Sequence, residues 1–533
     1  MGIYLNPGNE NFVEITGAKI YVDKSMMIAA LSEIIRSSNK YICVSRPRRF
    51  GKTITSNMLD SYYSKGSDSR ALFSKFRIAK SPLFGKDLNR FNVIKIDVNS
   101  EYRNALDKDS LILEISDDIR KEFKVQFPDI DFGNRDSIAK CIIRVFEATG
   151  EQFVILMDEY DVLVRENVSD SLFSQYLDLL NGLFKSDTVR PAIALAYLTG
   201  ILPIVRDKIQ SKLNNFREYT ILDSGPLSEY LGFTEDEVRR LCEEYSISFG
   251  DCRNWYDGYH LAWNENGAQK KCEIYNPESV VMSIDTGKFA GFWGATSSYE
   301  VISDRIQQNF AGIKDDVIRM VSGESVDVNV TSYKNTMKSF VTKSDVLTYL
   351  IHLGYLAYND SDSTCRIPNK EVRQEWLNAL EADNDYSETN AIIKASKELL
   401  SQTLSGNCGA VAESLDKSHI HVTSNRSYNN EYALQSAIYL SFIYALNKYA
   451  CFRELTTGKG FADMVYIPLS KDLPALIIEL KHNKCSETAL SQIKEKRYFD
   501  SLKNYSGNML FIGINYDEKT KKHDCNIEKF VKE

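Results

Sequence analysis

The sequence lacks the features that mark fibrous, disordered or membrane-spanning proteins. It has no low-complexity segment and no obvious internal repeat, which excludes the first two classes. The most apolar stretch, residues 191–205, is interrupted by Thr199, Gly200 and Pro203 and is too short to span a bilayer. The 10 cysteines include no C-x-x-C pair, and no secretory hydrophobic segment opens the chain. We therefore expect a soluble, cytoplasmic protein with reduced cysteines and no membrane partner.

A basic charge balance is also absent. The 533 residues carry 65 Lys and Arg against 73 Asp and Glu, which gives a formal net charge of −8. This balance excludes indiscriminate coating of nucleic acid, but it permits a local basic groove, because phosphate neutralisation depends on local charge. The length alone predicts three or four domains.

The first 225 residues alternate apolar, strand-like runs with amphipathic helical stretches. The expected strands are 41–45, 91–99, 153–158, 192–199 and 219–224, and a helix is expected at 53–63. Continuous apolar strands separated by helices predict a buried parallel sheet with helices on both faces. The fold class expected for this part is therefore α/β.

The loop after the first strand carries the second half of a P-loop. In such a loop, backbone N–H groups wrap phosphates, lysine reaches the terminal phosphate oxygens and threonine binds magnesium. We therefore assign Gly51, Lys52 and Thr53 to ATP and Mg²⁺, with Thr53 as a metal ligand. The first glycine of G-x-x-x-x-G-K-T is missing, and Arg46 stands in its place. Arg46 and Arg49 make the loop basic, so we also predict that both contact the nucleotide.

Two carboxylates end the most hydrophobic strand of this region. Asp158 and Glu159 stand where a P-loop ATPase places one carboxylate for its metal and a second to polarise the attacking water. We predict Asp158 as a magnesium ligand and Glu159 as a catalytic residue. Thr199, at the tip of the following strand, is predicted to contact the γ-phosphate. The alternative is that residues 158–161 are only a polar strand end.

After residue 225 the pattern becomes mostly helical, with Thr234 capping a helix. The aromatic segment 255–260 is expected to pack a lid against the ATPase core, with stacking on a base as the alternative. Residues 343–375 have the pattern helix, short hairpin, helix, which suits a winged-helix-like unit. The predicted parts are an ATPase domain (1–230), a helical lid (231–342), the winged-helix-like unit (343–375), a helical linker (376–427) and a nuclease-like domain (428–533).

The last part carries a metal-nuclease signature. It is predicted to contain a helix (431–449), three strands (451–455, 461–467 and 475–481), a second helix (486–502) and a last strand (509–514). Asp463 lies on the second strand, and Glu479 and Lys481 lie two apart on the third, so all three are expected on one face. Phosphodiester hydrolysis needs acidic ligands for divalent ions and a cation near the nucleophilic water. We predict Asp463, Glu479 and Lys481 as catalytic, with Asp463 and Glu479 binding Mg²⁺ or Mn²⁺; a solvated strand face is the alternative.

Three further residues are candidates for contact with the substrate. Glu431 lies on the helix before the strands. Gln492 and Lys496, at i and i+4 on the next helix, share a face that is expected to meet the substrate backbone.

Several short motifs together resemble one bacterial family. They are R-P-R-R-F-G-K-T, L-M-D-E-Y-D, T-G-I-L-P-I, L-N-N-F-R-E-Y-T, W-Y-D-G-Y and I-Y-N-P. The chain is similar over nearly its whole length to the AAA-ATPase-like family that ends in a PD-(D/E)XK nuclease domain. The resemblance implies an ASCE/AAA-like ATPase with a lid, a winged helix and a restriction-endonuclease-like domain. In that family an arginine replaces the first glycine of the loop, and a relation to defence ATPases implies antiphage or mobile-element roles.

Together these patterns predict an ATP-regulated, divalent-metal-dependent nuclease acting on DNA or RNA. A homo-oligomer is expected, because such ATP sites often need a neighbouring subunit. The alternative is a nucleotide-dependent sensor or scaffold whose last domain holds nucleic acid or protein without cutting. A DNA-translocating motor is disfavoured, because no helicase motif accompanies the P-loop.

Overall fold

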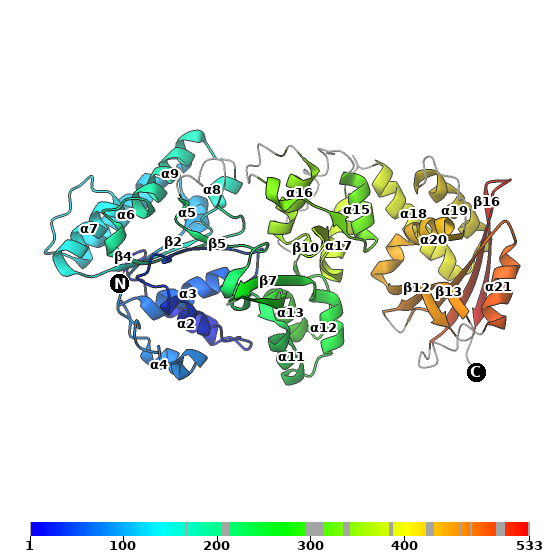
Figure 1. The fold of residues 1–533 in the computed structure, drawn as a ribbon, viewed down its shortest axis with the longest axis horizontal. Coiled ribbons are helices and arrows are strands. Elements are labelled where there is room, and N and C mark those ends of the chain that lie inside the picture. Colours follow the sequence, from blue (N-terminus) through cyan, green and yellow to red (C-terminus); the bar gives the residue numbers. More distant parts are fainter. Residues whose placement is uncertain are drawn as a thin grey trace. The chain divides into compact units, whose positions relative to one another are not determined.

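The computed structural model forms two compact units (Figure 1), the first made of residues 1–296 and 325–372 and the second of residues 297–324 and 373–533. It describes residues 2–166, 168–204, 213–265, 267–293, 313–333, 340, 342–382, 387–422, 431–457, 460–469, 472–496 and 507–530. Within these ranges, every helix is too short or too polar to traverse a lipid bilayer.

A five-stranded parallel sheet is the centre of the first unit, with the strand order β2-β3-β4-β1-β5. Its strands are β1 (Tyr41–Ser45), β2 (Asn92–Asp97), β3 (Phe153–Asp158), β4 (Ile193–Gly200) and β5 (Arg217–Tyr219). The prediction of a parallel α/β sheet is confirmed. Strand β5 is shorter than expected and begins earlier, because Thr220 turns the chain: its hydroxyl accepts the N–H groups of Leu222 and Asp223.

Helices cover both faces of this sheet, and the side chains of β3 alternate between the two cores. Phe153, Ile155 and Met157 belong to one apolar cluster, whereas Val154 and Leu156 belong to the other. This period of two is what a fully buried strand requires. One face is covered by α5 (Val98–Asn104), α6 (Leu111–Gln126), α7 (Ile138–Thr149), α8 (Val162–Arg165) and α9 (Asp170–Phe184), and the other by α1 (Glu10–Thr16), α2 (Met26–Ser32), α3 (Lys52–Tyr63) and α4 (Arg70–Phe73).

The segment after the sheet combines helices with a small sheet. Thr234 and Glu237 form a capping box at the start of the first helix, as the sequence predicts. A helical lid was predicted here, but the segment also contains a three-stranded sheet of order β6-β8-β7 that was not predicted. The elements are β6 (Phe233–Thr234), α11 (Glu235–Glu244), α12 (Phe249–Tyr256), β7 (Tyr259–Glu265), β8 (Ala268–Tyr275) and α13 (Pro277–Thr286).

The predicted helix, hairpin and helix are present, and the second helix continues from the first unit into the second. They are α16 (Lys343–Leu353), β10 (Ala357–Asn359), β11 (Thr364–Arg366) and α17 (Lys370–Ala382), and β9 (Val326–Asp327) adds a third strand. Asn369 caps α17 by accepting the N–H of Val372 at 3.0 Å. The aromatic segment packs as expected: the Tyr259 ring lies 5.4 Å from the Phe50 ring, and its hydroxyl donates to the Gly354 carbonyl at 2.6 Å.

The second unit contains a five-stranded mixed sheet of order β12-β13-β14-β15-β16, in which only the β14–β15 pair is parallel. The strands are β12 (Tyr449–Thr457), β13 (Gly460–Pro468), β14 (Ala475–His482), β15 (Met509–Asp517) and β16 (Lys522–Phe530). Helices α18 (Ser387–Ser405), α19 (Cys408–Val422) and α20 (Glu431–Ser441) pack on one face, and α21 (Ser486–Glu495) packs on the other. Helix α20 is shorter than predicted, because the chain continues as a 3₁₀ turn at Ile443–Asn447.

Candidate functional sites

The loop between β1 and α3 has the geometry of a phosphate-binding loop. Gly51, in the left-handed region with φ 81°, is the N-cap of α3. Such a backbone conformation is accessible to glycine at little cost, which explains this residue at the turn. The Lys52 amine is buried and donates to the carbonyls of Arg46 and Pro47 at 3.0 and 2.9 Å, and burial lowers its pKa. Thr53 is exposed in the first turn of α3, so its hydroxyl is accessible to a metal ion.

Arg46 was predicted to contact the nucleotide, but in this conformation its guanidinium is hydrogen-bonded to backbone carbonyls. The group is 1% exposed and donates to the carbonyls of Ser45, Tyr219 and Ser224 at 2.9, 3.2 and 3.4 Å. Burial lowers its pKa to about 10. Arg46 therefore links the loop to the end of β5 through hydrogen bonds. The sequence did not indicate this structural role.

Arg49 reaches from the loop to the lid. Its backbone is in the left-handed region with φ 68°. Its guanidinium donates to the Phe292 carbonyl at 3.0 Å and lies 3.7 Å from a carboxylate oxygen of Glu278. The predicted phosphate ligand is thus also a link between the loop and the segment that follows α13.

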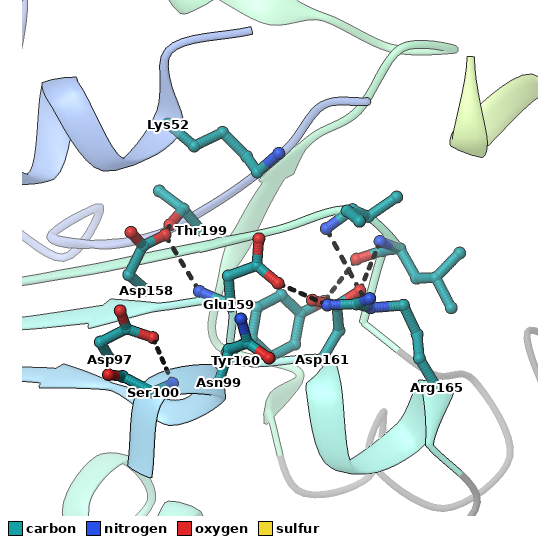
Figure 2. Close-up of polar contacts among 12 residues, drawn as sticks. Lys52, Asp97, Asn99, Ser100, Asp158, Glu159, Tyr160, Asp161, Arg165 and Thr199 are labelled. Carbon is teal, nitrogen blue, oxygen red and sulfur yellow. Dashed lines mark hydrogen bonds and ion pairs between the residues drawn. The ribbon is translucent and has the colours of Figure 1, made fainter. Parts of the chain in front are cut away.

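Carboxylates gather at the carboxyl ends of β2 and β3 (Figure 2). Asp158 and Asp97 are register partners in the parallel ladder. Asp158 is 2% exposed and accepts the Thr199 hydroxyl and, at 3.0 Å, the Glu159 N–H. Burial raises the pKa of Asp97, and the Asp158 charge adds to this effect. Asp97 was not predicted as a site residue, although it ends β2 as Asp158 ends β3.

Glu159 lies beside this pair in a backbone conformation that few residues adopt. Its φ is 50°, and one carboxylate oxygen lies 2.5 Å from the Arg165 guanidinium. The structure thus brings together Lys52, Asp158, Glu159 and Thr199, four of the residues predicted to handle ATP.

The predicted nuclease residues also converge, on the second unit's sheet. The Glu479 carboxylate accepts the Lys481 amine at 3.0 Å and the Gln492 side-chain amide. An Asp463 carboxylate oxygen accepts the Leu480 N–H at 2.7 Å, which places Asp463 beside the strand that carries Glu479. Because Glu479 and Lys481 are only 2% and 6% exposed, these charges do not belong to a solvated strand face.

The environment of Glu479 fits a divalent cation. Its Oε2 atom is buried and has no hydrogen-bond partner among the described residues. Burial and the neighbouring Asp463 charge raise the Glu479 pKa to about 7, and Lys481 opposes this shift. A desolvated carboxylate with an unsatisfied oxygen beside a second carboxylate is the donor set that Mg²⁺ or Mn²⁺ takes.

The three residues predicted to contact the substrate differ in where they lie relative to Glu479. Gln492 lies at the Glu479 carboxylate, and the charge of Lys496, which follows α21, lowers the Glu479 pKa. Glu431 begins α20, but its side chain lies outside the described residues. One turn further along α20, Gln435 donates to the Asp463 carbonyl at 2.9 Å, a contact that no motif in the sequence indicates.

Comparison with known proteins identifies two parts of the chain. Residues 7–210 match the family described as "Predicted AAA-ATPase", and residues 429–525 match the PD-(D/E)XK nuclease superfamily. The chain therefore joins an AAA-ATPase-like domain to a PD-(D/E)XK superfamily domain. A relative from Azotobacter chroococcum mcd 1, "Uncharacterized protein in vnfD 5'region", is 24% identical over 296 residues, 55% of this chain and 53% of the relative. The match thus spans about half of that relative.

The solved structures that the chain matches include two of the Aeropyrum pernix ORC2 protein. The ADPNP–ADP complexes share 10% identity with a TM-score of 0.28 and cover 68% of this chain and 97% of ORC2. The ADP form shares 9% identity with a TM-score of 0.26 and covers 67% and 92%. Likeness at this level carries no argument about the activity of the AAA-ATPase-like domain.

The raised pKa of Glu479 predicts that the free energy of unfolding of the PD-(D/E)XK domain depends on pH. Because the folded-state pKa of about 7 exceeds the ordinary 4.5, ionisation of Glu479 costs folding free energy as the pH rises between these values. We expect Glu479→Gln to stabilise the metal-free protein relative to wild type by roughly 3 kcal/mol above pH 7 and to have little such effect below pH 4.5. Mg²⁺ should cancel the difference, because it compensates the charge only in wild type.

Thermal melting across this pH range, with and without Mg²⁺, measures the effect. Glu528→Gln is the control, because Glu528 forms an exposed ion pair with Lys494 in the same domain. The same pH dependence in wild type and Glu479→Gln would contradict the assignment of a desolvated carboxylate with a raised pKa.

Proposed function

We propose that the protein is an ATP-hydrolysing, ATP-regulated nuclease that cleaves phosphodiester bonds of DNA or RNA with a divalent metal ion. One observation carries the proposal: the buried grouping of Glu479, Lys481 and Asp463, with one Glu479 oxygen unsatisfied. A buried ion pair is weak evidence for a stabilising role, since replacing it by apolar residues is often neutral or favourable. A catalytic role therefore explains the burial of these charged side chains better than a stabilising role does.

At the nuclease site, Asp463 and Glu479 would hold Mg²⁺ or Mn²⁺. The bound ion would supply Lewis-acid polarisation of the phosphate and a nucleophilic water. Lys481, 3.0 Å from Glu479, would orient the water, and Gln492 would fix the Glu479 carboxylate. Lys496 would contact the substrate backbone as a cation.

At the ATP site, Lys52 would exchange its two loop carbonyls for phosphate oxygens. Thr53 and Asp158 would hold Mg²⁺, Thr199 would sense the γ-phosphate through the hydrogen bond it makes with Asp158, and Glu159 would polarise water. We further propose a homo-oligomer, because this site type is often completed by a neighbour, and a role in prokaryotic defence or mobile-element biology.

A continuous set of hydrogen bonds in the first unit supports coupling of the ATP site to the winged-helix-like unit. Arg49 donates to the Phe292 carbonyl, while the Phe292 and Trp293 N–H groups donate to Glu371 at 2.7 and 2.8 Å. Glu371 is 1% exposed and also accepts the Ser279 hydroxyl at 2.9 Å. A change at Arg49 on nucleotide binding would therefore reach α17, the helix that leads into the second unit.

The substitution Glu371→Ala tests this coupling. We expect ATP affinity to remain within a few-fold of wild type, while the factor by which ATP changes the cleavage rate falls toward one. Couplings between sites commonly correspond to about 5- to 150-fold effects, so the loss is measurable. Nucleotide titration and cleavage assays with and without ATP give the two quantities.

Glu375→Ala is the matched control, because Glu375 is also a buried glutamate of α17, one turn further on. It should keep the ATP effect. Equal loss in both variants would indicate general damage to α17, and an undiminished ATP effect in Glu371→Ala would remove Glu371 from the coupling route.

A further inference from the structure

Arg165 connects two carboxylates at the end of β3 (Figure 2). Its Nη2 atom lies 2.5 Å from Glu159 Oε2, and its Nε atom donates to Asp161 Oδ2 at 3.0 Å. The Arg165 side chain is 9% exposed and that of Asp161 is fully buried. Two different N–H groups of one planar guanidinium therefore hold two carboxylates in a fixed relation.

Asp161 is itself hydrogen-bonded to the backbone that follows β4. Its Oδ2 atom accepts the N–H groups of Ile201 and Leu202 at 3.2 and 2.9 Å. These residues directly follow the strand that ends with Thr199 and Gly200. The guanidinium thus has a rigid anchor on the strand that carries the predicted γ-phosphate sensor.

The held carboxylate is the one predicted to act on water. Figure 2 shows one Glu159 oxygen directed at Arg165 and the other directed toward Lys52. The Glu159 backbone is held in the left-handed region with φ 50°, and its N–H donates to Asp158 at 3.0 Å. A non-glycine residue keeps this conformation only where its surroundings enforce it, and such positions cluster at functional sites.

We infer that Arg165 is a positioning residue for ATP hydrolysis. It binds Glu159 Oε2 and thereby keeps Oε1 facing the P-loop lysine, where a water molecule can be polarised. The inference rests on the proposed ATPase activity and extends it to the segment Asp158–Arg165, in which Asp161 is the anchor. Lysine cannot replace Arg165 fully, because a single ammonium lacks the planar fork that reaches both carboxylates.

The reaction that this arrangement serves is simple hydrolysis. The oxygen of the attacking water bonds to the γ-phosphorus, and the bond from that phosphorus to the bridging oxygen breaks. Glu159 Oε1 takes up the water proton, which it later releases to solvent, and the products are ADP and inorganic phosphate. Arg165 changes neither bond; it fixes the acceptor of the proton.

The test compares Arg165→Lys with wild type in the full-length chain. We expect kcat for ATP hydrolysis in Mg²⁺ to fall about 10- to 100-fold, the size expected when a catalytic group is misplaced by about an ångström. ATP affinity, measured by displacement of a fluorescent nucleotide, should stay within about twofold, because Glu159 is not a binding group. The lysine variant keeps a cation beside buried Asp161, which protects the fold.

Glu159→Gln, alone and combined with Arg165→Lys, makes the result specific. Since Arg165 acts through Glu159, the double variant should be no slower than Glu159→Gln. Arg120→Lys is the control, because Arg120 is also a largely buried arginine of this domain that pairs with a carboxylate, that of Asp117. It should leave both kcat and affinity unchanged.

Each outcome decides the question. An unchanged or higher kcat in Arg165→Lys, or a further loss in the Glu159→Gln background, overturns the role of Arg165 while leaving ATP hydrolysis standing. A fall in affinity equal to the fall in kcat also overturns it, because the residue then supports binding. Absence of hydrolysis in wild type overturns this inference together with the proposed ATPase activity.

Discussion

The substitution Lys481→Ala is expected to reduce phosphodiester cleavage by about 100- to 1000-fold, the usual effect of removing one preorganised donor at a reacting centre. The Lys481 amine lies 3.0 Å from Glu479 and is the cation nearest to the proposed metal site among the described residues that contact Glu479. Without it, the proposed water loses its orienting group and the Glu479 pKa rises further, because Lys481 now lowers it. Both changes act on cleavage and neither acts on the ATP site.

Cleavage of labelled nucleic acid in Mg²⁺ and in Mn²⁺ measures the loss, with ATP binding as a second readout. Lys494→Ala is the control, because Lys494 is an exposed lysine of the neighbouring helix α21, paired with Glu528. Unchanged cleavage in Lys481→Ala would show that the observed activity does not come from this site.

The substitution Lys52→Ala is expected to lower ATP affinity by about 10- to 100-fold, since charge-assisted hydrogen bonds contribute roughly 1.5 to 3 kcal/mol each. The amine now rests on two carbonyls of its own loop, so moving to phosphate oxygens needs only a local change. The variant should also lose whatever effect ATP has on cleavage, while cleavage without ATP remains.

Lys40→Ala is a close control for this experiment. Lys40 is likewise a buried lysine that donates to two backbone carbonyls, those of Arg190 and Ile193, both at 2.7 Å. It stands before β1, whereas the P-loop follows that strand. Comparable loss of ATP affinity in Lys40→Ala would assign the effect to damage of the sheet, and unaltered affinity in Lys52→Ala would refute the P-loop assignment.

Strong local signals explain which elements were predictable from sequence. Strands β1 and β3 have the predicted bounds because both are short, fully buried runs that are apolar up to one polar last residue. Helix α16 begins and ends where its cap and its left-handed Gly354 require. The β7–β8 hairpin was missed, although the Asn-Gly pair at 266–267 between alternating residues is a common hairpin signal. Strand β16 was missed because an edge strand rich in charged residues lacks the apolar pattern of a buried one.

Site residues that belong to a short sequence motif could be predicted from the sequence. Residues whose role depends on their tertiary contacts could not. Lys52, Asp158, Asp463 and Glu479 follow motifs whose spacing reflects strand ends and strand faces. Arg46 shows the limit of that reasoning, because only the tertiary structure reveals that carbonyls of β5 and its following turn hold its guanidinium. The roles of such residues depend on chain segments far apart in sequence.

Cleavage of a mixed DNA and RNA panel, with and without ATP, measures whether the protein is a metal-dependent nuclease controlled by ATP. Wild type, Lys481→Ala and Lys52→Ala would be compared in Mg²⁺ and in Mn²⁺. We expect metal-dependent cleavage by wild type, its loss in Lys481→Ala, and a retained but ATP-insensitive activity in Lys52→Ala. Absence of cleavage by wild type under every condition, with ATP still bound, would refute the nuclease assignment and favour a nucleotide-dependent sensor or scaffold.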